Sequence, residues 1–163
     1  DIDNTNSSIR NNRTTIKYQL RITPATLGLT APYTLNFNNA LTTSSVVSTS
    51  FTASDGNTYS LVDDGLGIMK VARTTSGVVD SPAVYFTLPD GTQNQGTIDY
   101  TTGKIVLTSF NPSTITDGTT YIKFTVTPSV NNSDITPLRE QILTYDVTDT
   151  ESIVINMVAE TII

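Results

Sequence analysis

The side chains that most often carry out chemistry in proteins are missing from this sequence. It contains no histidine and no cysteine. Their absence removes the commonest general base, the usual partner of a serine or cysteine nucleophile, and the imidazole and thiolate ligands of zinc. It also removes disulfides. The sequence therefore predicts a protein that is not an enzyme and needs neither a cofactor nor a metal, unless carboxylates act together.

Two carboxylates are enough for one reaction class, the hydrolysis of glycosidic bonds. The candidates are the adjacent pair Asp63-Asp64 and the three glutamates Glu140, Glu151 and Glu160. Adjacent residues of a strand point to opposite faces, and Asp63-Asp64-Gly65 is typical of a hairpin turn. We therefore expect the pair to shape a turn. A carboxylate-only glycosidase is the less favoured alternative.

Acidic residues also raise the question of calcium. Asp55-Gly56-Asn57 begins like a calcium loop, but Tyr59 occupies the next alternate position and no glutamate follows at the required distance. Asp146, Asp149 and Glu151 surround another predicted turn and have the ligand type of a weak calcium site. We expect both groups to be solvated turns.

Charge and hydropathy exclude two classes of partner. The formal net charge is −6 and the pI is near 4.3, so the chain repels a phosphate backbone and nucleic acid is not expected to bind. No apolar stretch approaches the roughly 20 residues of a membrane helix. Threonine is the most frequent residue, and its β-branched side chain favours strands while its hydroxyl stays solvated. This composition is typical of virion or extracellular β proteins.

Apolar and polar residues alternate with a period of two in several segments bounded by Gly, Pro or Asn, which predicts strands without intervening helices. The clearest segments are 16–23, 33–37, 84–88 and 122–126, and further strands are predicted at 46–52, 58–62, 67–72, 141–147 and 152–159. Between Thr97-Ile98 and Ile105–Leu107, the stretch Asp99–Lys104 predicts a short hairpin loop in which Gly103 has a positive φ. We expect an all-β fold, an antiparallel β-sandwich or partly open barrel of about eight to ten strands.

The pattern also suggests a domain organisation. Residues 1–15 are polar and predict a linker or arm, whereas residues 16–163 form the β domain. A turn-rich break at 128–137 marks a possible sub-boundary before a C-terminal hairpin. The chain opens with Asp1 and closes on apolar residues, from which we expect a fragment of a longer protein.

Three stretches, 51–67, 96–105 and 134–143, together resemble the C-terminal part of the ring-forming wedge subunit of T-even-like myovirus baseplates, especially the versions found in marine phages. The resemblance covers roughly residues 30–163. The middle stretch alone is a generic hairpin, and the order and spacing of all three carry the likeness. The N-terminal half of the family is missing here, and residues 1–15 align to nothing in it.

The resemblance implies a virion structural protein of the tail baseplate, assembled in the host cytoplasm, that forms homo-oligomers and contacts other wedge proteins. It brings no cofactor and no catalysis. The positions that it implies for the hairpin are Gly96, Asp99, Tyr100 and Gly103. The motif before the last strands would contain Pro137, Arg139 and Gln141.

Two parts of the C-terminal region contain candidate interface residues. The planar guanidinium of Arg139, next to Gln141 in the same motif, could hold a carboxylate or a carbonyl pair in a dry interface, or could lie exposed at a strand edge. The apolar C-terminal run, Ile153 to Ile163, would join a neighbour through an exposed edge. Its candidate contact residues are Ile153, Ile155 and Met157.

A different class remains open beside the assembly protein. An Ig-like adhesin or receptor-binding module of a bacterium or phage tail would have the same Thr-rich, acidic composition. A carbohydrate platform usually stacks exposed aromatic residues on one face, often tryptophan. This chain has no tryptophan, and its seven tyrosines are spread over different predicted strands.

Overall fold

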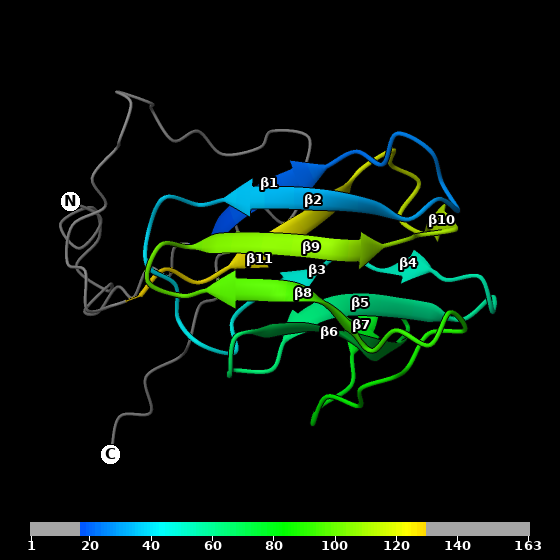
Figure 1. The fold of residues 1–163 in the computed structure, drawn as a ribbon. Helices are drawn as coiled ribbons and strands as arrows, with labels where there is room; N and C mark the ends of the chain where they lie inside the picture. The colour runs from blue at the N-terminus through cyan, green and yellow to red at the C-terminus, as the bar shows by residue number, and fades with distance from the viewer. Residues whose placement is uncertain (1–16, 130–163) are drawn as a thin grey trace, which may run out of the picture. The chain divides into compact units, whose positions relative to one another are not determined.

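The computed structural model describes residues 17–129, and this part of the chain is built of strands without a helix. Figure 1 shows the arrangement. In chain order the strands are β1 (Tyr18–Ile22), β2 (Ala31–Asn36), β3 (Val47–Ser48), β4 (Phe51–Thr52), β5 (Thr58–Asp63), β6 (Ile68–Thr75), β7 (Val78–Val79), β8 (Asn94–Asp99), β9 (Lys104–Phe110), β10 (Thr114–Ile115) and β11 (Ile122–Val126).

Eight of these strands follow one another along a single hydrogen-bonded path, β1-β11-β3-β5-β6-β8-β9-β2. Every neighbouring pair on the path is antiparallel, so its two end strands, β1 and β2, also run antiparallel to each other. The sheet curls until β1 and β2 lie near each other, as Figure 1 shows, but the path contains no hydrogen-bonded pairing between them. The fold is a partly open antiparallel barrel, and the predicted fold class is confirmed.

The alternation of side chains explains which face of each strand is buried. In β11, Ile122, Phe124 and Val126 are fully buried, whereas the two residues between them are only partly covered. The interior of the barrel is filled by large apolar side chains, among them Phe51 and Phe110, whose rings meet edge to face with centroids 5.1 Å apart. Each such side chain contributes about 1.5–3 kcal/mol through burial.

Most strands lie where the alternation predicts them, and two segments differ. The predicted strand 46–52 is divided into β3 and β4, because the chain changes partners there: β3 pairs with β11 and β5, while β4 pairs with β10 and β5. The predictions at 141–147 and 152–159 lie outside the described residues, as do the arm at 1–15 and most of the break at 128–137.

The prediction of a strand at 84–88 is wrong in that only one bridge forms there, between Tyr85 and Ala72. The segment still bonds to β6, since Arg73 N donates to the Val84 carbonyl and Phe86 N donates to the Val71 carbonyl, each at 3.0 Å. The ladder is not extended because prolines without a backbone donor occupy positions 82 and 89.

The hairpin between β8 and β9 forms as predicted. The Asp99 carboxylate accepts hydrogen bonds from Thr101 N at 2.9 Å and from the Thr102 hydroxyl at 2.8 Å. Gly103 has a φ of 69° and donates its N–H to the Asp99 carbonyl at 2.8 Å. A side chain at position 103 would also collide with the carbonyl of Asn39, so both the dihedral and the space require glycine.

Gly96 lies in the middle of β8, at a very close approach to β9. A Cβ at this position would stand 2.0 Å from the carbonyl oxygen of Val106 and 2.8 Å from the Cα of Leu107. We expect Gly96→Ala to lower the free energy of unfolding by about 3 kcal/mol, measured by urea denaturation, because two backbones must separate. The control is Gly56→Ala, where the new methyl meets open space and only a left-handed φ of 80° costs about 1–2 kcal/mol. Equal losses for the two variants would contradict this account.

Candidate functional site

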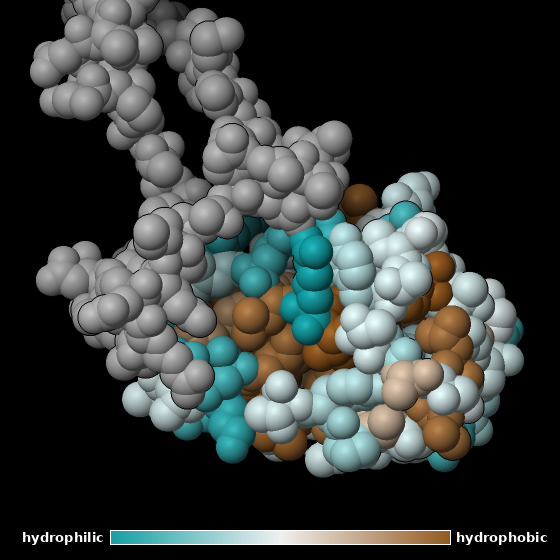
Figure 2. All heavy atoms as spheres, turned by 90° about the horizontal axis from the view of Figure 1, so that it is seen from above, coloured by the Kyte–Doolittle hydropathy of each residue, from teal (hydrophilic) through white to brown (hydrophobic). Residues whose placement is uncertain are grey.

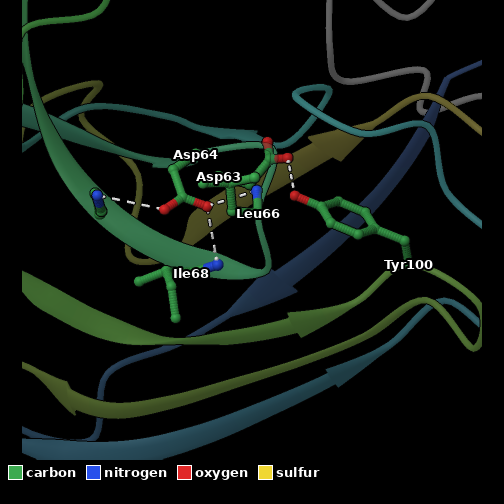
Figure 3. A network of polar contacts seen from close by, with 6 residues as sticks. Asp63, Asp64, Leu66, Ile68 and Tyr100 are labelled. Atoms are coloured by element: carbon green, nitrogen blue, oxygen red, sulfur yellow. Dashed lines mark hydrogen bonds and ion pairs between the residues drawn. The ribbon is translucent and has the colours of Figure 1, made fainter.

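The adjacent carboxylates Asp63 and Asp64 are the strongest candidates for chemistry in the described residues, and Figure 3 shows their surroundings. Asp63 is the last residue of β5 and is buried, with 5% of its surface exposed. Its Oδ1 accepts a hydrogen bond from Val46 N at 2.8 Å, and its Oδ2 accepts bonds from Ser44 N at 2.6 Å and the Tyr100 hydroxyl at 2.7 Å. Asp63 thereby fastens the segment before β3 and the β8–β9 hairpin to the end of β5.

Asp64 turns to a different set of partners. Its Oδ1 accepts hydrogen bonds from Leu66 N at 2.8 Å and Ile68 N at 3.1 Å, and its Oδ2 lies 3.3 Å from Lys70 Nζ. Burial raises the pKa of Asp64, but the hydrogen bonds from Ile68, Leu66 and Lys70 lower it more, so the pKa lies below its ordinary value of 3.8. Asp64 thus shapes the turn that the sequence predicted for the pair, whereas Asp63 binds segments outside that turn.

The geometry of Asp63 and Asp64 argues against a catalytic pair of general acid and base. A glycosidase needs two carboxyl groups that face one substrate, one of them with a raised pKa. Asp63 and Asp64 face separate partners, and the pKa of Asp64 moves in the opposite direction. Glu140, Glu151 and Glu160 lie outside the described residues.

The predicted calcium-like loop is also a self-contained turn. Asp55 accepts hydrogen bonds from Asn57 N at 2.9 Å, Asn57 Nδ2 at 3.0 Å and the Tyr59 hydroxyl at 2.7 Å. Burial raises the pKa of Asp55, and these bonds lower it by more. Within residues 17–129 no three acidic side chains gather in a way that could hold a metal ion. Asp146, Asp149 and Glu151 are not among those residues.

Other aspartates serve the same structural purpose. Asp90 and Asp117 each accept bonds from the backbone N–H and the hydroxyl of a threonine two residues later. Asp80 accepts a bond from the Thr75 hydroxyl at 2.7 Å and from Arg73 Nε at 2.6 Å, and these two bonds lower its pKa. Carboxylates in this part of the chain are thus used as acceptors that hold turns.

A small cleft lies beside Arg73. Its lining includes Asn57, Tyr59 and Phe86, and its volume is about 230 Å³. Ligand pockets usually measure roughly 300–1,000 Å³. The Arg73 guanidinium already pairs with Asp80 and lies 5.9 Å from the centre of the Phe86 ring. The charged group of the cleft is therefore already engaged within the protein.

The most distinctive feature of the described residues is the place where the barrel fails to close. We call it the open seam, formed by β1 (Tyr18–Ile22) and β2 (Ala31–Asn36). Apolar side chains from both strands line the core along it, namely Tyr18, Leu20, Ile22, Tyr33 and Leu35. Figure 2 views the molecule from above in the frame of Figure 1, where these strands lie uppermost, and shows hydrophobic side chains gathered in a hollow with hydrophilic ones at its rim.

The open seam contains one polar atom whose hydrogen bonding is unsatisfied. The Tyr18 hydroxyl is buried, yet it has no hydrogen-bond partner. Leaving such a group unsatisfied costs about 1–3 kcal/mol. A group that arrived along the seam could supply this bond.

The two edges of the seam differ as acceptors for a further strand. β2 contains Pro32, which has no backbone N–H, and its register against β9 shifts between Ala31 and Tyr33. β1 contains no proline and pairs with β11 in unbroken register from Tyr18↔Val126 to Ile22↔Ile122. Of the two end strands, β1 therefore has the more regular backbone.

Sequence reasoning did not find the open seam. The interface residues that it predicted, Arg139, Gln141, Ile153, Ile155 and Met157, all lie outside the described residues. One local signal was available, because Pro32 within an otherwise strand-like segment marks an edge strand. That β1 is the other end of the path depends on pairings between distant segments, which no local pattern contains.

Comparison with known proteins adds no relative: no protein-family model matches the chain, and neither the curated proteins nor the solved structures gave a match. Within residues 17–129 there is no helix with the length and apolar character needed to cross a membrane.

The Asp63 network gives a stability prediction. In Asp63→Asn the amide replaces one acceptor oxygen by a donor that faces a donor, so we expect the free energy of unfolding to fall by about 2–3 kcal/mol in urea denaturation. Tyr100→Phe removes one hydrogen bond and leaves the two backbone bonds of Asp63 intact, so its expected cost is about 1 kcal/mol. A larger loss for Tyr100→Phe than for Asp63→Asn would contradict the assignment.

The lowered pKa values of Asp55, Asp64, Asp80 and Asp99 predict a pH dependence. The unfolded chain takes up protons on these groups at a higher pH than the folded chain does. Stability from them is therefore complete above about pH 5 and is lost as the pH falls through the folded pKa values. Urea midpoints measured from about pH 6 to pH 2 should fall less steeply for Asp64→Asn than for the wild type. Parallel curves would refute the role of Asp64.

Proposed function

We propose that this chain is a structural component of a phage tail baseplate in the virion, where it associates with itself and with other wedge proteins. It performs no catalysis and needs no cofactor in this role. The observation that carries the proposal is the open seam, where the described strands form a well-packed barrel whose end strands, β1 and β2, are not hydrogen-bonded to each other, and where Tyr18, Leu20 and Tyr33 lie half-buried at the edge of the core. The resemblance of stretches 51–67, 96–105 and 134–143 to the baseplate wedge family supplies the identity of the assembly.

An open edge favours an assembly protein for a physical reason. Free N–H and C=O groups in a row are a template for another strand, and monomeric proteins usually block such edges with charges, bulges or covering loops. Here β2 carries a proline and a register shift, whereas β1 contains no proline and keeps an unbroken register with β11. An edge of this kind suits a protein whose partner is always present.

The use of the carboxylates supports the same proposal. Asp55, Asp63, Asp64 and Asp99 hold turns or connect segments through two or more hydrogen bonds each. Groups engaged in this way stabilise a defined shape. A protein that transmits force or closes a ring needs such rigid connections between strands.

The contact residues that we propose are in the C-terminal region. Ile153, Ile155 and Met157 would contribute an apolar strand face, and Arg139 with Gln141 would contribute polar contacts to a neighbour. The run Ile153 to Ile163 contains one charged residue, Glu160. Low charge and branched apolar side chains are what an interface strand requires.

Deleting residues 151–163 should convert the self-associated protein to a monomer. We expect light scattering coupled to size-exclusion chromatography to show a mass above that of one chain for the full sequence and the monomer mass for the truncated one. The control is deletion of residues 1–15, which should leave the mass ratio to one chain unchanged.

Two results would count against the proposal. An unchanged oligomeric mass after truncation would remove the C-terminal run as the contact. Binding of the intact chain to a glycan array, lost on substitution of tyrosines in its loops, would favour the adhesin instead.

A further inference from the structure

A leucine side chain extends into solvent at the turn between β5 and β6. Leu66 is 88% exposed, the largest exposed fraction among the large hydrophobic residues that the structure describes. Its backbone is fixed, because Leu66 N and Ile68 N both donate to Asp64 Oδ1, as Figure 3 shows. The Gly67 carbonyl also accepts a hydrogen bond from Ile98 N in β8 at 2.9 Å. The position of this apolar group is therefore set before any partner binds, which lowers the entropy cost of a contact.

The other end of the β5–β6 hairpin contains the small cleft beside Arg73, which we call the Arg73 cleft (Figure 1). The hydroxyl groups of Tyr59 and Thr74 donate hydrogen bonds within the protein, at 2.7 and 3.1 Å. The rings of Tyr59 and Phe86 lie 5.7 Å apart between their centroids. These side chains therefore offer rings and a methyl group to the cleft. Its full lining is Asn57, Thr58, Tyr59, Arg73, Thr74 and Phe86.

The size of the Arg73 cleft suits a single apolar side chain. Its volume is about 230 Å³. A cavity of about 150 Å³ already holds benzene, which is a larger group than the side chain of leucine. An aliphatic side chain requires no hydrogen bond, which matches a cleft whose arginine is already paired with Asp80. Val84, whose carbonyl accepts a hydrogen bond from Arg73 N, is 39% exposed and adds apolar surface near the cleft.

We propose that Leu66 of one copy of this chain inserts into the Arg73 cleft of a second copy. The contact rests on the proposed self-association and assigns it an anchor and an acceptor. Five residues of β6 separate Ile68 from Arg73, about 17 Å of strand, so Leu66 does not reach the cleft of its own copy. Because the two surfaces differ, the contact is head-to-tail, and contacts of this kind generate rings or filaments.

The charges beside the two surfaces permit this approach, although the whole chain has a net charge of −6. Next to Leu66, Asp64 Oδ2 lies 3.3 Å from Lys70 Nζ. Next to the cleft, Asp80 Oδ2 lies 2.6 Å from Arg73 Nε. Each surface therefore carries charges of both signs, and opposite charges can face each other at the rim of the contact.

The first test uses disulfide cross-linking in a chain that has no natural cysteine. Intact Leu66→Cys and Asn57→Cys chains, one of them tagged, are mixed under mild oxidation at a concentration where the wild type self-associates. We expect mixed dimers to form about tenfold or more faster than in a control mixture of Leu66→Cys with Leu29→Cys. Leu29 is also exposed but is not part of the cleft lining.

A second pair of variants measures how much Leu66 contributes to self-association. Leu66→Ser should weaken the self-association of the intact chain by about tenfold or more, as expected of a buried anchor, in sedimentation experiments over a range of concentrations. The matched control is Leu29→Ser, which removes another exposed leucine and should leave the affinity unchanged. Urea midpoints equal to that of the wild type show that both variants are folded.

Three outcomes would overturn the contact. Mixed dimers at the control rate, together with self-association that Leu66→Ser leaves unchanged, would overturn the contact and leave the proposed function standing. Disulfides between two Leu66→Cys chains in place of mixed dimers would mean that Leu66 meets its own counterpart, which overturns the cleft as the acceptor. A wild-type chain that is monomeric at every concentration would overturn both the contact and the proposed self-association.

Discussion

The antiparallel hydrogen-bonded path from β1 to β2 is the constraint on which the rest of this structure depends. Seven pairings connect eight strands, and some of them join segments far apart in the sequence, such as β1 with β11 and β2 with β9. Because each pairing is antiparallel, the first and last strands have opposite directions and could complete a barrel. Within residues 17–129 no eighth pairing joins β1 to β2, so this part of the chain forms a well-packed barrel that is partly open.

Core packing and fixed turns stabilise the barrel although β1 and β2 are not paired with each other. The core is filled by fully buried side chains such as Phe51, Phe110 and Phe124, and β5 and β9 contribute further buried residues to it. Several aspartates fix turns, and Asp63 instead joins distant segments, since it connects β5 to the segment before β3 and to Tyr100. Burial and the bond to Asp63 raise the pKa of Tyr100 well above its usual range, so this phenol stays a hydrogen-bond donor at any physiological pH.

How far the sequence predicts this structure depends on the range of the interaction. Local alternation is sufficient for β11, whose bounds match the predicted segment 122–126, and turn chemistry is sufficient for the Asp99–Lys104 loop. The strand order is not predictable in this way, because any two alternating segments can pair. The division at 49–50 and the failed strand at 84–88 have the same origin, since both depend on which neighbour the backbone meets.

The same distinction between local and long-range interactions applies to the candidate site. The turn role of Asp64 is local and was predicted, but the bond that Asp63 accepts from Tyr100, 37 residues away, depends on the β5–β6–β8 arrangement. The open seam is further from prediction, because it is defined by a pairing that does not form. The predicted interface residues all belong to the C-terminal region, and the seam belongs to the N-terminal strands. The alternation of Ile153, Ile155 and Met157 can be read from the sequence, whereas the end strands of the hydrogen-bonded path can be read only from the fold, so each contains information that the other lacks.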